Sequence, residues 1–77
     1  MFAIALRNQQ HTREYVVSMS QPSGWELTRR EDFQRIQREH FTDWHRVERA
    51  LAVVRREVED LRALGWRVER SGRSVES

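Results

Sequence analysis

His40, His45 and Glu48 are the residues whose types and spacing come nearest to metal chemistry. His45 and Glu48 are three positions apart, close to one helical turn, and His40 precedes His45 by five positions. Imidazole and carboxylate groups can together hold zinc or a similar ion in tetrahedral or open geometry. The spacing, however, matches no established motif such as two histidines four apart around a glutamate, and polar residues on a helix surface explain it better. We therefore expect no metal site and no cofactor.

Nucleophilic catalysis would need a serine or threonine, a histidine and an acid that converge in a cleft. The chain contains no Gly-x-Ser-x-Gly motif, and its three glycines are too few to build a phosphate-binding loop. It also contains no cysteine, which excludes a thiol nucleophile, thiolate metal ligands and disulfide bonds. Seventy-seven residues are few for enclosing a ligand pocket of the usual size, about 300 Å³ or more. We expect that the protein is not an enzyme.

Arginine supplies all fourteen basic side chains, although the formal net charge is only +2. Arginine is well suited to phosphate contacts and to stacking on bases, and three tryptophans, three phenylalanines and one tyrosine accompany it. Nucleic-acid binding is therefore one functional hypothesis, with candidate contacts at Arg29, Arg30, Arg35 and Arg38. Acidic residues interrupt this cluster, which is also typical of a solvated strand face with cross-strand ion pairs.

A long helix within residues 42–66 is the clearest structural prediction, and the other elements are arranged around it. Its apolar residues follow one another in steps of three and four, the spacing of one buried helical face. They are Trp44, Val47, Leu51, Val54, Val58 and Leu61. Thr42 or Asp43 can cap the first turn, and Gly65 stands where a left-handed C-terminal cap is expected. The pattern therefore predicts one long amphipathic helix.

The same six apolar residues are also a candidate surface for a partner helix. Their steps fit the two core positions of a heptad repeat, which would allow a coiled coil with a second copy of the chain. The repeat covers barely three heptads, however, which is near the lower limit for a coiled coil. Packing on the chain's own strands is the favoured interpretation, and a homodimer through this helix is the alternative.

Alternation of apolar and polar residues predicts strands before the helix. Residues 2–6 and 15–19 alternate, and the polar run 8–12 joins them as a hairpin. Because this run contains neither Asn-Gly nor Asp-Gly, we predict that the hairpin has no tight two-residue turn. Residues 21–24, Gln-Pro-Ser-Gly, then interrupt the chain before a third strand over residues 25–30.

Residues 31–41 allow two interpretations. Their apolar and aromatic side chains have helical spacing, so a short helix over residues 31–40 is one alternative. A lone hairpin, however, would be marginally stable and would cover the long helix poorly. We therefore favour a turn around Glu31 and Asp32 followed by a fourth strand over residues 34–41.

Together these elements predict an α+β fold, an antiparallel meander of three to four strands with the C-terminal helix packed on one face. Residues 1–70 would form a single domain and residues 71–77 a disordered tail, while Trp66 and Val68 would lie on the core or form a short last strand. No apolar segment is long enough for a signal peptide or a membrane span, so we expect a cytoplasmic protein. The leading functional hypothesis is a small protein-interaction or assembly module that self-associates or binds a protein partner, and the alternative is arginine-based binding of RNA or DNA.

Overall fold

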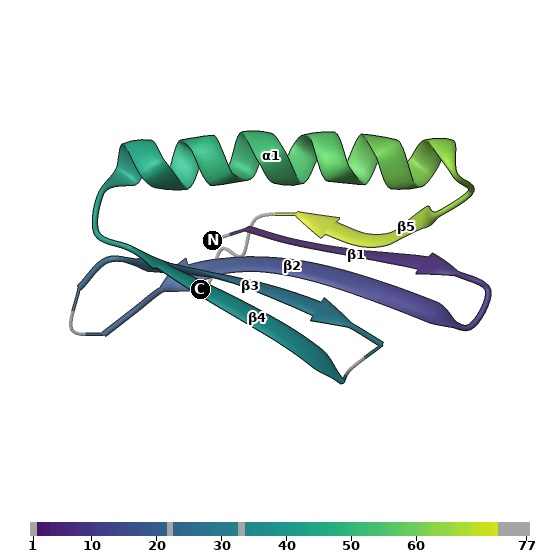
Figure 1. Ribbon diagram of the computed structural model, residues 1–77, viewed down its shortest axis with the longest axis horizontal. Coiled ribbons are helices and arrows are strands. Elements are labelled where there is room, and N and C mark those ends of the chain that lie inside the picture. The colour runs from purple at the N-terminus through teal and green to yellow at the C-terminus, as the bar shows by residue number, and fades with distance from the viewer. Residues whose placement is uncertain (1, 22, 33, 73–77) are drawn as a thin grey trace.

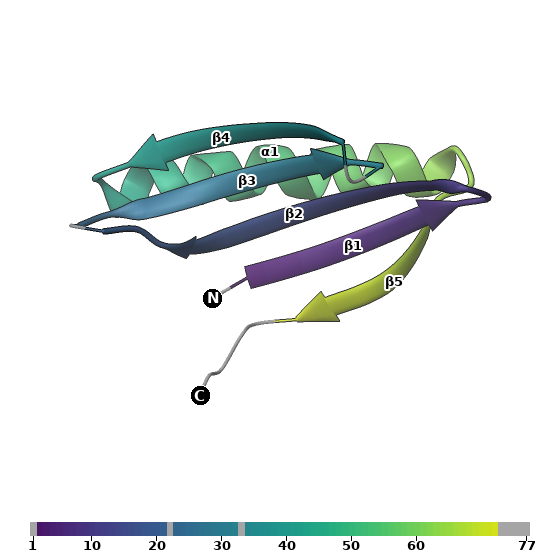
Figure 2. The ribbon, with the colours of Figure 1, turned by 90° about the horizontal axis from the view of Figure 1, so that it is seen from below.

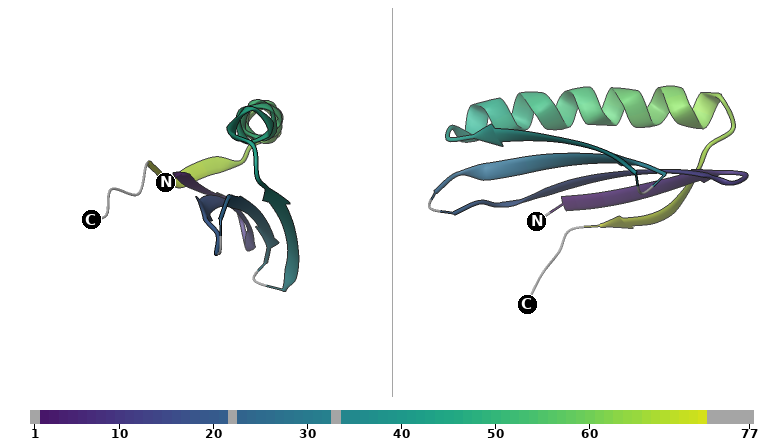
Figure 3. Two further views of the ribbon diagram at one scale, coloured as in Figure 1. Left: turned by 90° about the vertical axis from the view of Figure 1, so that its left-hand side faces the viewer. Right: turned by 60° about the horizontal axis from the view of Figure 1, so that its bottom comes forward.

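The computed structural model describes residues 2–21, 23–32 and 34–72. Its elements are β1 (Phe2–Asn8), β2 (His11–Met19), β3 (Trp25–Glu31), β4 (Arg35–Phe41), α1 (Trp44–Ala63) and β5 (Arg67–Gly72) (Figure 1). The strands form one antiparallel sheet in the order β4-β3-β2-β1-β5, and α1 packs against one of its faces (Figure 3). The predicted α+β class, a meander with a helix on one face, is confirmed. β5, which contains Val68, is the short last strand that we gave as one alternative for the residues after the helix, and it makes the sheet five-stranded.

β1 and β2 are joined by a tight turn, so the prediction that no tight turn forms here is wrong. Asn8 pairs with His11, and only Gln9 and Gln10 lie between the two strands. Gln9 has a φ of 56°, a left-handed conformation that short hairpin turns require and that residues other than glycine rarely adopt. The prediction failed because it required an Asn-Gly or Asp-Gly pair, whereas Gln9 itself adopts the left-handed conformation and the backbone pairing continues through the polar residues on both sides.

β3 and β4 form the second hairpin, so the strand interpretation of residues 34–41 is confirmed and the short helix is wrong. Their register is unbroken from Trp25 opposite Phe41 to Glu31 opposite Arg35. Helical spacing occurs here because β4 lies at the edge of the sheet, where six of its seven residues are exposed. Without a buried face, nothing imposes alternation of apolar and polar residues along the strand.

α1 has the caps that the sequence predicts at both ends. Asp43 is the N-cap, and its Oδ1 accepts a hydrogen bond from the backbone N–H of His45 at 3.0 Å. At the other end Gly65 has a φ of 103°, and the N–H of Trp66 bonds to the carbonyl of Leu61. This Schellman arrangement reverses the chain, so that Trp66 packs against the core. No helix among the described residues is long and apolar enough to cross a membrane.

One core lies between α1 and the sheet. The three central strands contribute alternate residues, whose side chains point toward the helix. These are Ile4, Leu6, Tyr15, Val17 and Leu27. The helix contributes Val47, Val54, Val58 and Leu61. Because burial of a large apolar side chain stabilises a fold by about 1.5–3 kcal/mol, this single layer supplies most of the stabilisation.

β5 pairs with β1 at the edge opposite to β4, so α1 carries the chain from one edge of the sheet to the other (Figure 2). The β1–β5 register shifts between Ala5 and Leu6, which marks a β-bulge or a similar irregularity. β5 continues to Gly72, two residues into the segment that we predicted as a disordered tail. Residues 73–77, the rest of that predicted tail, lie outside the described residues.

Candidate interaction surface

The four arginines predicted as nucleic-acid contacts divide between the two faces of the sheet. Arg29 and Arg35 lie on the face that α1 covers, in alternation with residues of the opposite face. Arg30 and Arg38 therefore lie on the open face, where Arg30 Nη1 is 3.5 Å from Oε1 of Glu14. The four guanidinium groups thus do not form one continuous patch.

The described aromatic residues lie away from the open face. Those that belong to the core or pack against it are Phe2, Tyr15, Trp25, Phe41 and Trp66. Trp44 belongs to α1 and meets Trp25 edge-on, with the ring centroids 5.1 Å apart. A stacking surface for single-stranded nucleic acid needs exposed rings among its arginines. Within the described part of the chain, the open face of the sheet carries none of these six rings.

The apolar stripe of α1, our alternative partner surface, faces the chain's own sheet. Val47, Val54, Val58 and Leu61 are buried in the core. Leu51 is partly buried against it. Trp44, at the start of the helix, keeps 42% of its surface exposed. Most of the stripe is thus covered within one chain, and little of it is left for a second helix.

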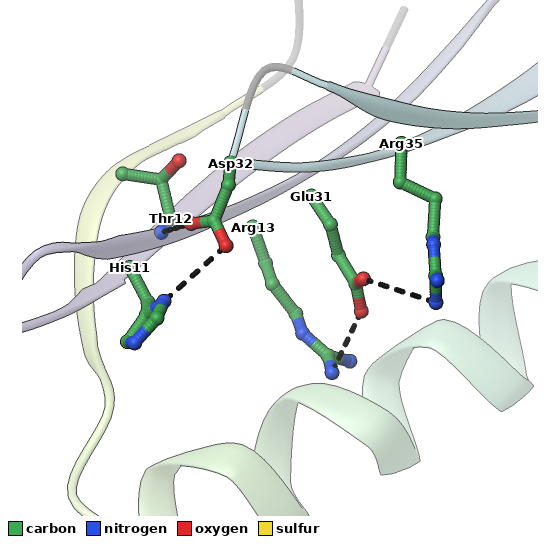
Figure 4. Close-up of polar contacts among 6 residues, drawn as sticks. All are labelled: His11, Thr12, Arg13, Glu31, Asp32 and Arg35. Carbon is green, nitrogen blue, oxygen red and sulfur yellow. Dashed lines mark hydrogen bonds and ion pairs between the residues drawn. The ribbon is translucent and has the colours of Figure 1, made fainter.

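Polar side chains beneath the helix form two groups of ion pairs. The first, which we call the Glu31 cluster, consists of Arg13, Glu31 and Arg35. Arg13 Nη2 lies 2.8 Å from Oε2 of Glu31, and Arg35 Nη1 lies 3.9 Å from Oε1 of the same carboxylate (Figure 4). Arg13 also stands over the ring of Trp66, 5.6 Å from its centroid, in cation–π contact. The outer end of the cluster is the side chain of Arg35, which is 79% exposed.

The second group, which we call the Arg29 cluster, consists of Glu39, Arg29 and Glu57. Arg29 donates from Nη1 to Glu39 at 3.0 Å and from Nη2 to Glu57 of α1 at 3.4 Å. The guanidinium group therefore connects β3, β4 and the helix. The side chain of Glu39 is 53% exposed. This cluster ends in an exposed carboxylate, as the Glu31 cluster ends in an exposed guanidinium group.

A hollow of about 430 Å³ lies beside Tyr15, with residues of both clusters in its wall. Tyr15 is 2% exposed, and burial raises the pKa of its hydroxyl above the ordinary value of 10.0. The guanidinium group of Arg13 opposes this rise in pKa, while Glu57 adds to it. Each of the four arginines in the wall is already paired with a carboxylate. Three glutamates share the wall with these four arginines, so the hollow carries little excess positive charge with which to hold an anionic ligand.

The turn that precedes β4 is tied to the beginning of β2. Asp32 accepts hydrogen bonds from the backbone N–H of Thr12 at 2.8 Å and from Nδ1 of His11 at 3.2 Å (Figure 4). The Thr12 hydrogen bond, and then that of His11, lowers the pKa of the Asp32 carboxyl below its ordinary value of 3.8. These contacts hold the turn from which β4 begins.

His40, His45 and Glu48 make separate contacts. His40 Nε2 donates to the carbonyl of Ser23 at 3.0 Å, in the connection between β2 and β3. His45 Nδ1 lies 3.7 Å from Oε1 of Glu48 on the surface of α1. Within residues 2–21, 23–32 and 34–72, no three or more His, Cys, Asp or Glu side chains are grouped so that they could hold a metal ion.

β4 is a free edge of the sheet (Figure 2). Six of its seven residues are exposed. It pairs with β3 on one side over all seven residues, without a register shift. An edge strand presents unpaired backbone N–H and C=O groups, to which another strand can bind. β5, the other edge, has a register shift in its pairing with β1. β4 is therefore the more regular of the two edges.

The role of Glu39, one of the acidic residues that interrupt the arginine cluster, was missed by sequence reasoning. In a strand, residues two apart point to the same side, so Arg35, Gln37 and Glu39 share one face. The signal that could have identified this pattern is a pair of opposite charges spaced symmetrically about a neutral residue in an edge strand.

Comparison with known proteins finds no protein-family model, no curated protein and no solved structure that matches the chain. The features of the molecule that bear on its function are therefore the geometry of β4 and the ion pairs beside it.

Proposed function

We propose that the protein is a small, non-catalytic interaction module that self-associates by pairing the free edge of β4 with a second copy of the chain. The observation that carries this proposal is the regular, exposed backbone of β4, seven residues long. Natural sheets commonly protect such an edge with a proline, a bulge or a covering element. The single proline of the chain is at position 22, outside β4, and the pairing of β4 with β3 contains no bulge.

The charges of β4 are compatible with selective pairing. Arg35, Arg38 and Glu39 would disfavour an arbitrary apolar strand, which protects the edge against aggregation. They include both signs, however, so a strand with a matching pattern of charges would be accepted. A second copy of β4 is such a strand when the two run antiparallel.

The size of the fold gives self-association a physical benefit. A domain of this length buries only about 60% of the surface of its unfolded chain, and its core is a single layer. Pairing along β4 adds backbone hydrogen bonds to the sheet. Because association binds only the folded form, it stabilises the protein by mass action.

Sedimentation velocity over a wide range of protein concentration tests the proposal. We expect the mass to rise from that of the 9.3 kDa monomer to twice that value as concentration increases. Ile36→Lys places a charge on the β4 edge and should weaken the dimer. Val68→Lys is the matched control, because Val68 lies on the other edge strand and is 38% exposed, close to the 44% of Ile36.

Two results would contradict self-association through β4. One is a monomeric mass for the wild-type protein at every concentration. The other is a dimer that Val68→Lys dissociates as effectively as Ile36→Lys, because that would place the interface elsewhere. Far-UV circular dichroism of both variants shows whether the fold is retained, so that loss of the dimer is not confused with unfolding.

A further inference from the structure

Opposite charges stand at equal distances on either side of Gln37 in β4. Arg35 and Glu39 are each two residues from Gln37, so the three side chains share the helix-facing side of the sheet. The side chain of Arg35 is 79% exposed, and that of Glu39 is 53% exposed. Each forms the outer end of one ion-pair group, Arg35 of the Glu31 cluster and Glu39 of the Arg29 cluster.

Antiparallel pairing of β4 with its own copy about a two-fold axis determines which residues meet. The residue on the axis faces itself, and residues at equal distances on either side of it face each other. With Gln37 on the axis, Arg35 faces Glu39 of the partner subunit, and this pair occurs twice. Ile36 faces Arg38 of the partner subunit on the open side of the sheet, where the aliphatic stem of the arginine can cover it.

The neighbouring registers lack this complementarity. An axis at Arg38 places two guanidinium groups opposite each other, and an axis at Glu39 does the same with two carboxylates. Like charges directly opposite one another destabilise a pair of strands. An axis at Ile36 places Arg35 opposite the neutral amide of Gln37 of the partner subunit, so no ion pair forms there.

We propose that two copies pair their β4 strands antiparallel about an axis at Gln37. Two five-stranded sheets then become one ten-stranded sheet with both helices on the same face. This inference rests on the self-association proposed above and names its register. The pairs between Arg35 and Glu39 join the Glu31 cluster of one chain to the Arg29 cluster of the other. Exposed ion pairs add little affinity, so they select the register while backbone hydrogen bonds hold the strands together.

Disulfide formation between introduced cysteines tests the register directly, because the chain contains no cysteine of its own. The variants Ile36→Cys, Gln37→Cys and Arg38→Cys are oxidised under identical mild conditions at a concentration where the protein is dimeric. Residues on the axis have Cα atoms about 4.5–5.5 Å apart, within the disulfide range of about 4.4–6.8 Å, whereas diagonal neighbours are about 7–8 Å apart. We expect Gln37→Cys to form the covalent dimer at least about tenfold faster than the other two variants.

Charge reversal supplies an independent test in solution. Arg35→Glu sets two carboxylates opposite each other and Glu39→Arg two guanidinium groups, so each variant alone should dimerise at least about tenfold more weakly than the wild type. When the two variants are mixed, opposite charges meet at both positions, and a heterodimer should form with nearly the wild-type affinity. Arg70→Glu is the matched control, because it makes the same change of charge at an exposed position of β5, the other edge strand, and should leave the dimer intact.

The outcomes separate the register from the proposed function. A wild-type protein that remains monomeric overturns both. A wild-type dimer that cross-links fastest at position 36 or 38, or whose two charge variants do not recover dimerisation on mixing, overturns the register alone. Fastest cross-linking at position 37 together with recovery on mixing supports the pairing about Gln37. The cysteine variants retain this readout even if a charge variant does not fold.

Discussion

At the scale of single residues, Tyr15 shows how the fold changes the chemistry of a side chain. Its hydroxyl is buried beneath α1 beside Arg13 and Glu57, and burial is the main reason for its raised pKa. The folded protein therefore holds the phenolic proton more tightly than the unfolded chain does. The resulting stabilisation is fully present below about pH 10, the unfolded pKa, and is lost as the pH rises through the higher folded pKa.

Titration of Tyr15 is predicted to show a midpoint above pH 10 in the folded protein and close to 10 in urea. The measurement is the absorbance of the phenolate, and it is unambiguous because Tyr15 is the only tyrosine. The chain also lacks lysine and cysteine, so no other side chain titrates near pH 10. Tyr15→Phe should remove both the absorbance change and the loss of stability above pH 10. A folded-state midpoint at or below 10 would contradict the burial of this hydroxyl.

At the scale of elements, α1 packs against the sheet with one of its faces, and two adjacent valines can test this packing. Val54 is fully buried against the sheet, whereas Val53 keeps 50% of its surface exposed. The two residues have the same side chain and stand in the same helix, so their helix propensities cancel in a comparison. They differ only in what covers them.

Val54→Ala is predicted to lower the free energy of unfolding by about 2 kcal/mol, because it removes buried methyl groups and leaves a cavity. Val53→Ala should change it by no more than about 0.5 kcal/mol, as is usual for surface substitutions. Urea denaturation of both variants measures the difference. Equal losses for the two valines would show that α1 does not pack on the sheet by the side that contains Val54.

At the scale of the whole molecule, the two edges of the sheet are not equivalent. β4 pairs regularly with its neighbour, while β5 is joined to β1 through a shifted register. Self-association through β4 would cover the outward backbone groups of that strand and leave β5 as it is. β5 can therefore serve as an internal control for measurements on β4 in the same protein.

Amide hydrogen exchange at increasing protein concentration is predicted to slow in β4 and to stay unchanged in β5. The reason is that backbone N–H groups that bond to a second strand are protected from solvent for as long as the dimer persists. The experiment compares residues 35–41 with residues 67–72 in the wild-type protein, with no substitution. Slowing in β5 alone would move the interface to the other edge, and equal slowing in both strands would indicate general stabilisation without a specific edge.

The sequence was sufficient for the features that neighbouring residues establish among themselves. The Asp43 cap and the Gly65 reversal each involve groups only a few positions apart, and the α1 stripe repeats every three or four residues. The alternation of apolar and polar residues also predicted β1 and β2, because one face of each strand is buried. These signals are local, so the sequence predicted an α+β meander with one long helix.

The three-dimensional arrangement was needed wherever the outcome depends on residues far apart in the chain. The tight turn at Gln9 became visible only from the pairing of Asn8 with His11, and β5 exists because α1 returns the chain to the free side of β1. The division of the arginines between two faces follows from strand register, as does the alignment of Arg35 and Glu39 at a free edge. Register and edge position result from long-range backbone pairing, which leaves no periodic pattern in an exposed strand such as β4.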